Sequence, residues 1–323
     1  MSDLIQLEAV VSDELVGKRL DQAVAQLFPD FSRSRLQTWI KNGSLTVDGE
    51  VKRPRDKLVG GESVTIEAEL EVIEDHKAQD IPLDIVYEDE DILVVNKPAG
   101  LVVHPAVGHR DGTLLNALLH HCPDIAQVPR AGIVHRLDMD TTGLMVIAKT
   151  IAAQTDLVDQ LQDRSMGREY EAIVHGVMTG GGIVDEPMGR HSKNRQKMAV
   201  VGVGKEAVTH YRVLQKLRAH THIRLKLETG RTHQIRVHMS HINYPLVGDQ
   251  LYGGRFRLPK GCSDEMIEAL RQFKRQALHA KKLELYHPET GELMSWEVDL
   301  PEDFQALLLV LQQDAESNDM DNF

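Results

Sequence analysis

Charged and hydroxyl side chains gather in one short segment, residues 132–150, with the sequence GIVHRLDMDTTGLMVIAKT. Apolar stretches with strand character flank its polar centre, and Gly143 allows the chain to turn back. Loops held between strands commonly carry catalytic groups. Arg136 lies two residues before Asp138 and favours the ionised carboxylate. Asp138 is therefore a candidate catalytic residue; a polar turn closed by side-chain hydrogen bonds is the alternative.

A second segment, residues 228–241, has the sequence ETGRTHQIRVHMSH and changes from a strand pattern to a helix pattern after Gly230. Thr232 is the predicted N-cap of that helix. Arg231 and Arg236 then lie near the positive end of the helix dipole, where a phosphate or a carboxylate binds favourably.

Neither a metal nor a nucleotide cofactor is predicted. His233, His238 and His241 lie close in the sequence, but their spacing is not H-E-x-x-H, no glutamate lies among them, and the neighbouring arginines oppose a cation. The chain has no Walker A loop, no G-x-G-x-x-G after a strand and no G-x-S-x-G elbow.

Two further segments give weaker signals. In NKPAGLVVHP, residues 96–105, Lys97 is placed to face a phosphate, although a surface turn explains it equally well. In GREYEA, residues 167–172, Tyr170 precedes an apolar strand, where core packing is the usual role of a tyrosine.

Periodicity predicts a small unit at residues 17–70. A helix over 20–28 ends at Pro29, and a second helix begins after Ser32 as N-cap and stops at Gly43. Asp48-Gly49 predicts a hairpin, and residues 61–70 form a further strand.

The rest of the chain predicts a larger α+β unit, with a mainly antiparallel mixed sheet flanked by helices. Alternating strands begin at residues 91, 143, 170, 220 and 283, and helices are expected at 113–121, 151–163 and 264–274. Residues 301–313 fit an amphipathic helix, and the acidic tail from residue 314 is expected to be disordered.

The net charge of −12 is unevenly distributed along the 323 residues. Residues 1–16, 71–91 and 302–323 carry −4, −8 and −6, so the remainder carries +6, and residues 17–57 hold nine basic against five acidic side chains. A basic surface flanked by acidic segments is compatible with a nucleic-acid partner. No apolar run is long enough for a membrane span, and the acidic start is unlike a signal peptide, so we expect a cytoplasmic protein with two reduced, buried cysteines.

Taken together, these motifs resemble those of the RluA-type pseudouridine synthases. HRLDMDTTG is similar to the family signature H-R-L-D-x-x-T-S-G, with Thr142 where serine is more usual. NKPAGLVVHP and GRTHQIRVH resemble the first and third family motifs, and residues 17–70 resemble the S4 RNA-binding domain. The resemblance implies an extension at 1–16, an S4-like domain at 17–75, a catalytic domain at 76–301, and a helix with an acidic tail at 302–323.

The resemblance also implies residue roles. Asp138 matches the essential aspartate, Arg236 its cationic partner, Tyr170 the tyrosine against the target base, and Arg136 the arginine that keeps the flipped nucleotide out of the stack. Phosphate contacts are expected from Lys97, Arg231, Arg19, Arg33, Lys41, Arg53 and Arg55.

The implied reaction is the isomerisation of uridine in RNA, which requires no cofactor and no metal. The implied partner is the helix 69 loop of 23S rRNA, free or within the large ribosomal subunit, and the protein is expected to act as a monomer without a membrane. Two alternatives remain open: a non-catalytic RNA-binding protein of ribosome assembly, and a hydrolase that uses Asp138 with Asp140 as acid and base.

Overall fold

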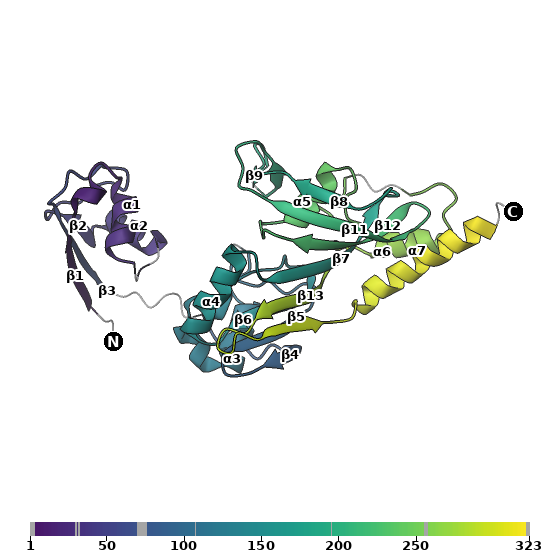
Figure 1. The fold of residues 1–323 in the computed structure, drawn as a ribbon, viewed down its shortest axis with the longest axis horizontal. Helices are drawn as coiled ribbons and strands as arrows, with labels where there is room; N and C mark the ends of the chain where they lie inside the picture. Colours follow the sequence, from purple (N-terminus) through teal and green to yellow (C-terminus); the bar gives the residue numbers. More distant parts are fainter. Residues whose placement is uncertain are drawn as a thin grey trace. The chain divides into compact units, whose positions relative to one another are not determined.

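The computed structural model describes residues 4–29, 31, 33–69, 76–106, 108–194, 196–254 and 258–320. The chain forms two compact units, Met1–His76 and Lys77–Phe323, called here the N-terminal and C-terminal units (Figure 1). Ser32, the predicted N-cap, lies outside the described residues.

The N-terminal unit packs two helices, α1 (Leu20–Leu27) and α2 (Arg33–Asn42), against a three-stranded sheet. Its strands are β1 (Leu4–Val10), β2 (Leu45–Val47) and β3 (Ser63–Glu69), in the antiparallel order β1-β3-β2. The apolar faces of the helices, including Leu20, Leu36 and Ile40, are fully buried.

Two predictions for this unit need correction. Residues 4–10 are not a separate extension, because β1 pairs with β3 along its whole length. The turn at Asp48 and Gly49 is present, with positive φ at both residues and a single antiparallel bridge from Val47 to Glu50 across it. The hairpin extends no further than this bridge, and β2 pairs along its length with β3. Sequence alone favoured the nearest partner, whereas the buried alternation of Val64 and Ile66 makes β3 the central strand.

The C-terminal unit is built on a nine-stranded sheet in the order β4-β5-β6-β13-β7-β12-β11-β8, with β14 paired to β13. All neighbours are antiparallel except β6 and β13, so the predicted mixed, mainly antiparallel α+β architecture is confirmed. The strands are β4 (Ile85–Glu88), β5 (Ile92–Lys97), β6 (Thr142–Ala148), β7 (Gly167–His175), β8 (Gly182–Asp185), β11 (Val208–Lys216), β12 (His220–Leu227), β13 (Leu278–Tyr286) and β14 (Leu293–Glu297). A separate hairpin consists of β9 (Met188–Arg190) and β10 (Met198–Val200).

Around β5 and β6, both faces of this sheet are buried. On β5, Leu93 and Val95 join the core that contains α3 (Leu114–His121) and α5 (Gln234–His241), whereas Ile92 and Val94 join the core beneath α4 (Ile151–Gln162). A further core holds α6 (Asp264–Gln272) and α7 (Glu302–Met320), the long yellow helix of Figure 1. Apolar side chains on alternate sides of a strand explain why the predicted strands read as nearly continuous apolar runs.

Helix ends account for two more corrections. The helix α5 is capped by His233 in a left-handed conformation with φ 58°, not by Thr232. The helix α7 continues to Met320, so the disorder predicted from residue 314 is wrong at least that far. The carboxylate of Asp314 accepts hydrogen bonds from Arg218 at 2.7 and 2.9 Å, which holds the acidic end of the helix against the sheet.

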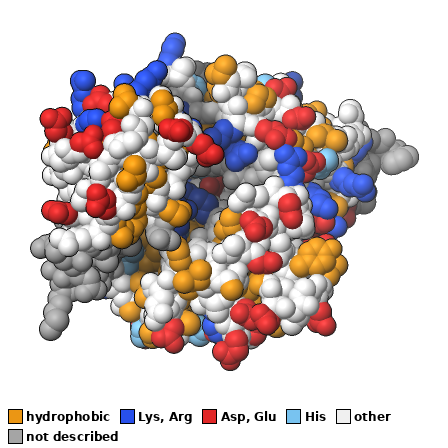
Figure 2. Space-filling view, turned by 60° about the vertical axis from the view of Figure 1, so that its left-hand side comes forward, with side chains coloured by type: hydrophobic (Ala, Val, Ile, Leu, Met, Phe, Trp, Pro, Cys, Tyr) orange, Lys and Arg blue, Asp and Glu red, His pale blue; other side chains and the backbone are white. Residues whose placement is uncertain are grey.

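The surface bears charges of both signs, with lysine and arginine interspersed among acidic side chains on the face shown in Figure 2. Within the described ranges, no helix has the length and apolar character to cross a bilayer. Cys122 and Cys262 are free thiols, and both are half-buried rather than fully buried as predicted.

Candidate active site

A pocket of about 350 Å³ in the C-terminal unit collects the segments singled out in the sequence. Its lining includes the loop before β6 with Asp138, the start of β7 with Tyr170, and the start of α5 with Arg236. Asp140 is absent from this lining and borders a different hollow beside α6 and α7. The hydrolase alternative, which pairs Asp138 with Asp140, therefore lacks the shared pocket that it requires.

Asp138 and Arg236 meet across this pocket although 98 residues separate them. The Nη1 of Arg236 donates to Oδ2 of Asp138 at 2.9 Å, and the Asp138 side chain is 16% exposed. The carboxylate is thus accessible from the pocket and has a cationic neighbour.

Arg236 is itself held by a second carboxylate, Asp249. Its Nε donates to Oδ2 of Asp249 at 2.7 Å and its Nη2 to Oδ1 at 2.9 Å, the bidentate geometry that fixes a guanidinium in place. Burial disfavours both charges, but their mutual hydrogen bonds and attraction prevail: the pKa of Asp249 lies below its ordinary value and the pKa of Arg236 above it. The backbone N–H groups of Leu251 and Tyr252 also donate to Oδ1 of Asp249, at 2.9 Å each.

A chain of hydrogen bonds orients His233 toward Asp138. The backbone N–H of Met198 donates to the Tyr252 hydroxyl, which lies 2.8 Å from Nδ1 of His233. The hydroxyl therefore donates to Nδ1, and Nε2, 3.8 Å from Oδ1 of Asp138, carries the proton. Burial lowers the pKa of His233, and the charge of Asp138 opposes this only partly.

Lys97 supports the loop that carries Asp138, which corrects the prediction that this lysine contacts a phosphate. The ammonium of Lys97 donates to the carbonyl oxygens of Pro98, Leu101 and Met139 at 2.7 to 2.9 Å. The side chain is 1% exposed, so it has neither a free donor nor access to an RNA phosphate. Burial lowers its pKa to about 8, which leaves the ammonium mostly charged at neutral pH.

Glycine is required where this loop enters β6. A Cβ on Gly143 would lie 2.3 Å from the carbonyl oxygen of Ala280 on the neighbouring strand, and its φ is 113°. The close parallel pairing of β6 with β13 at this point fixes the end of the Asp138 loop against the sheet.

Tyr170 and Arg168 line the floor of the pocket from β7. Residues two apart on a strand point to the same face, and both of these side chains are more than nine-tenths buried. Burial raises the pKa of the Tyr170 hydroxyl, so the phenol stays protonated across the neutral range. Tyr170 thus presents a neutral aromatic ring to whatever occupies the pocket.

The remaining predicted RNA contacts are mostly exposed. Arg136 and Arg231 lie at the pocket of the C-terminal unit, and Nε of Arg231 donates to the carbonyl of Glu206. In the N-terminal unit, Lys41, Arg53 and Arg55 are exposed and Arg19 is half-buried. Arg19 pairs with Asp21 and Arg53 with Asp56, and the side chain of Arg33 lies outside the described part.

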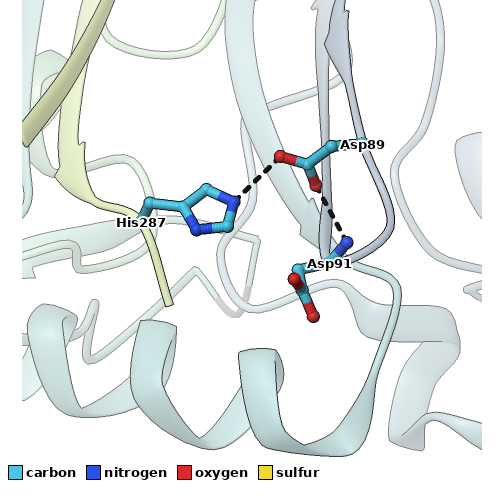
Figure 3. A group of neighbouring side chains, drawn as sticks. All are labelled: Asp89, Asp91 and His287. Carbon is cyan, nitrogen blue, oxygen red and sulfur yellow. Dashed lines mark hydrogen bonds and ion pairs between the residues drawn. The ribbon is translucent and has the colours of Figure 1, made fainter. Parts of the chain in front are cut away.

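One group of metal-ligand type occurs away from the pocket, formed by Asp89, Asp91 and His287 (Figure 3). Nδ1 of His287 accepts from two backbone N–H groups, so its proton lies on Nε2 and is donated to Asp89 at 2.8 Å. Asp89 accepts three more hydrogen bonds, from Tyr87 and from the backbone of Asp91 and Ile92. These interactions already use the ligand atoms of Asp89 and His287, and they explain the cluster as a hydrogen-bonded support of the turn between β4 and β5.

The sequence reasoning missed Asp249, Tyr252, His233 and Arg168 as parts of the site. Asp249 and Tyr252 belong to GDQLYGG, which by itself indicates only a turn. His233 was considered only as a metal ligand. Arg168 lies at the start of a strand, where a charged residue is usually exposed. For His233, the feature that indicates a functional position is visible only in the structure. It is a non-glycine residue with positive φ at the edge of a pocket, and such residues often mark functional positions.

Comparison with known proteins supports the geometry. A family model described as RNA pseudouridylate synthase matches residues 91–241, and an S4 domain model matches residues 18–64. The chain is 67% identical to ribosomal large subunit pseudouridine synthase D of Pseudomonas aeruginosa, over 98% of this chain and 99% of the relative. It is 58% identical to the protein of that name from Escherichia coli K12, over 98% of each. Among solved structures, human RNA pseudouridylate synthase domain containing 4 is similar, with TM-score 0.55, 27% identity, and coverage of 70% of this chain and 92% of that one.

Proposed function

This chain belongs to the RluA-type RNA pseudouridine synthases, and we propose that it isomerises uridine to pseudouridine in the helix 69 loop of 23S rRNA, with Asp138 as the catalytic carboxylate. The single observation that carries the role of Asp138 is its position in the pocket, bonded to a buried arginine and facing the same space as Tyr170. The ribosomal substrate is supported by the names of the relatives.

The reaction breaks the bond between C1′ and N1 of uridine, rotates the detached base, and joins its C5 to C1′. The proton lost from C5 is balanced by the proton gained at N1, so the RNA keeps its mass. Asp138 either bonds to C1′ or removes a proton from C2′ in the first step. Both roles require an ionised carboxylate with one free oxygen, and the hydrogen bond from Arg236 to Oδ2 leaves Oδ1 available.

The other residues of the pocket act on the base and on the RNA around it. The ring of Tyr170 stacks on the flipped uracil, and Arg136, exposed at the pocket, fills the place that the base leaves in the RNA. Extruding a base costs a few kcal/mol and is easier from a loop than from a paired helix, which favours a loop substrate.

The N-terminal unit anchors the RNA through its phosphates. The exposed side chains of Lys41, Arg53 and Arg55 and the half-buried Arg19 supply contacts that hold the RNA without reading its bases. We place the protein in the cytoplasm as a monomer, acting on rRNA or on the large ribosomal subunit during its assembly.

The test uses the full chain, an in vitro transcript of the 23S rRNA segment with helix 69, and chromatography of the nucleosides. Asp138→Asn should lower pseudouridine formation by about 10²–10⁴-fold or more while RNA affinity persists. Asp140→Asn is the matched control, because Asp140 lies two residues away and outside the pocket, and it should retain most of the activity. If the unmutated chain binds the transcript and forms no pseudouridine, the non-catalytic RNA-binding alternative replaces this proposal.

A second test addresses Arg236. Arg236→Ala removes the partner of Asp138 but no RNA-facing charge, since the guanidinium is buried between two carboxylates. The rate at saturating RNA should therefore fall far more than the affinity. An equal loss of both would contradict the assigned role.

A further inference from the structure

Arg168 carries a buried charge, and the described part of the chain gives it no counter-charge. Its residue is 6% exposed, its Nε is buried without a hydrogen-bond partner, and within the described chain it has no ion pair. Arg236, in the same pocket, is by contrast held by two carboxylates. Burying an unpaired guanidinium is costly, because the group gives up its hydration without compensation.

The surroundings of Arg168 preserve its charge instead of neutralising it. Burial lowers the pKa of the guanidinium, but arginine starts from so high a value that it remains a cation. The neighbouring His135 stays neutral, because burial and then the charge of Arg168 lower its pKa to about 3. Nε2 of His135 accepts from the backbone of Val146, so this ring supplies no negative charge.

Space for the guanidinium is also built into the pocket wall. A Cβ on Gly230 would lie 2.8 Å from Nη1 of Arg168, so glycine at this position leaves room for the head group. Arg168 and Tyr170 project from the same face of β7 into the same pocket. A ligand that stacks on Tyr170 therefore comes within reach of an unpaired cation.

We propose that Arg168 is a further catalytic residue, whose guanidinium binds a carbonyl oxygen of the uracil and stabilises the negative charge of the detached base. This inference rests on the proposed function and assigns it one more group. When the C1′–N1 bond breaks, its electron pair moves onto the uracil and spreads over N1, O2 and O4. The base loses this negative charge when the C1′–C5 bond forms, after which C5 loses its proton and N1 gains one. The cation therefore acts between cleavage of the C1′–N1 bond and formation of the C1′–C5 bond.

A phosphate of the RNA backbone is the other anion that a guanidinium binds. The depth of Arg168 favours the base, because a side chain this buried lies beneath the rim where exposed Arg136 and Arg231 meet the solvent. A contact to phosphate would act on affinity, whereas a contact to the leaving base acts on the rate of the chemical step.

The experiment measures single-turnover pseudouridine formation and equilibrium affinity for the helix 69 transcript with full-length chains. Arg168→Met should reduce the saturating rate by about 10²–10³-fold and change the affinity by less than about threefold. Arg168→Lys, which keeps the charge, should recover at least about tenfold of that loss. Gly230→Ala, which displaces the guanidinium without removing it, should also lower the rate. Arg164→Met is the control, since Arg164 is exposed and paired with Glu206 and Glu228.

Each other outcome overturns the assignment. Loss of affinity at an unchanged saturating rate would assign Arg168 to a phosphate, and no change in either quantity would leave the cation without a role. Thermal unfolding of Arg168→Met should occur at the wild-type temperature or above, because an unpaired buried charge is removed; a marked fall would indicate a structural role. Failure of the unmutated chain to form pseudouridine is a separate result, which refutes the proposed function itself.

Discussion

Replacing Asp249 with Asn tests whether one buried carboxylate holds the pair of Asp138 and Arg236 in place. The side chain of Asp249 is 0% exposed, and its two oxygens have different partners. Oδ1 accepts from two backbone N–H groups and from Nη2 of Arg236, whereas Oδ2 accepts only from Nε of Arg236. The backbone donors therefore keep the amide oxygen of the asparagine at Oδ1, and its NH₂ group takes the place of Oδ2.

This orientation brings two donors face to face. The new amide nitrogen would lie at the site 2.7 Å from Nε of Arg236, so one charge-assisted hydrogen bond is lost and a buried guanidinium loses half of its neutralising charge. Losing such a bond costs about 1.5–3 kcal/mol, and breaking a buried ion pair about 3–5 kcal/mol. The retained bond to Oδ1 places the expected loss near the lower end, at about 3 kcal/mol of the free energy of unfolding of the C-terminal unit.

Urea unfolding followed by tryptophan fluorescence measures this loss. The chain has two tryptophans, Trp39 in the N-terminal unit and Trp296 in the C-terminal unit, so a Trp39→Phe background reports the C-terminal unit alone. Asp303→Asn is the matched control, because Asp303 binds Arg275 in the same bidentate manner but is 49% exposed; it should cost less than about 1 kcal/mol. Equal effects of the two substitutions would refute the view that burial makes the Asp249 pair strong.

Three further predictions concern other parts of the chain. Lys97→Met should lower the free energy of unfolding by about 1–3 kcal/mol, because three carbonyl oxygens lose their shared donor, and should leave the salt dependence of RNA binding unchanged in titrations at several ionic strengths. The pKa of Asp89 is lowered from 3.8 to about 2, so its stabilising contribution is complete above 3.8 and is lost as the pH falls to about 2. Wild type and Asp89→Asn should therefore converge in stability across this interval in acid-unfolding experiments, and a constant difference would contradict the reasoning. Deleting residues 1–75 should weaken RNA binding and reduce its salt dependence, while the rate at saturating RNA is retained.

The sequence predicted those elements whose own residues determine them. β5, β7 and β12 combine dense apolar runs with clear boundaries, and each is present where the pattern placed it. The strand β1 was missed because Gln6 and Glu8 dilute its alternation, and its pairing depends on β3, more than 50 residues away. The continuation of α7 was missed for a similar reason, since the anchor of Asp314 is Arg218, which lies in the turn between β11 and β12, 96 residues earlier in the chain.

In the candidate site, too, the features that depend on distant partners were the ones that local sequence patterns did not predict. The resemblance placed Asp138, Arg236 and Tyr170 in one candidate site, and all three line the same pocket, because motif resemblance carries information about distant partners that spacing does not. Lys97 was misassigned because the carbonyl of Met139, which it binds, belongs to a loop 42 residues later. A lysine before a proline is typical of a surface turn, and only the folded chain shows that three carbonyl oxygens converge on it.

Arg236 bonds to two carboxylates in different ways, and this division of its donors suits the role proposed for Asp138. Its bidentate fork is directed at Asp249, whose oxygens are thereby both occupied and which is fully buried. Asp138 receives a single bond, to Oδ2, so the charge is stabilised while Oδ1 remains available to substrate. If the fork were directed at Asp138 instead, both of its oxygens would be occupied and the ionised carboxylate would be a poor nucleophile and a poor base. The second carboxylate, Asp249, therefore allows Arg236 to hold Asp138 without occupying both of its oxygens.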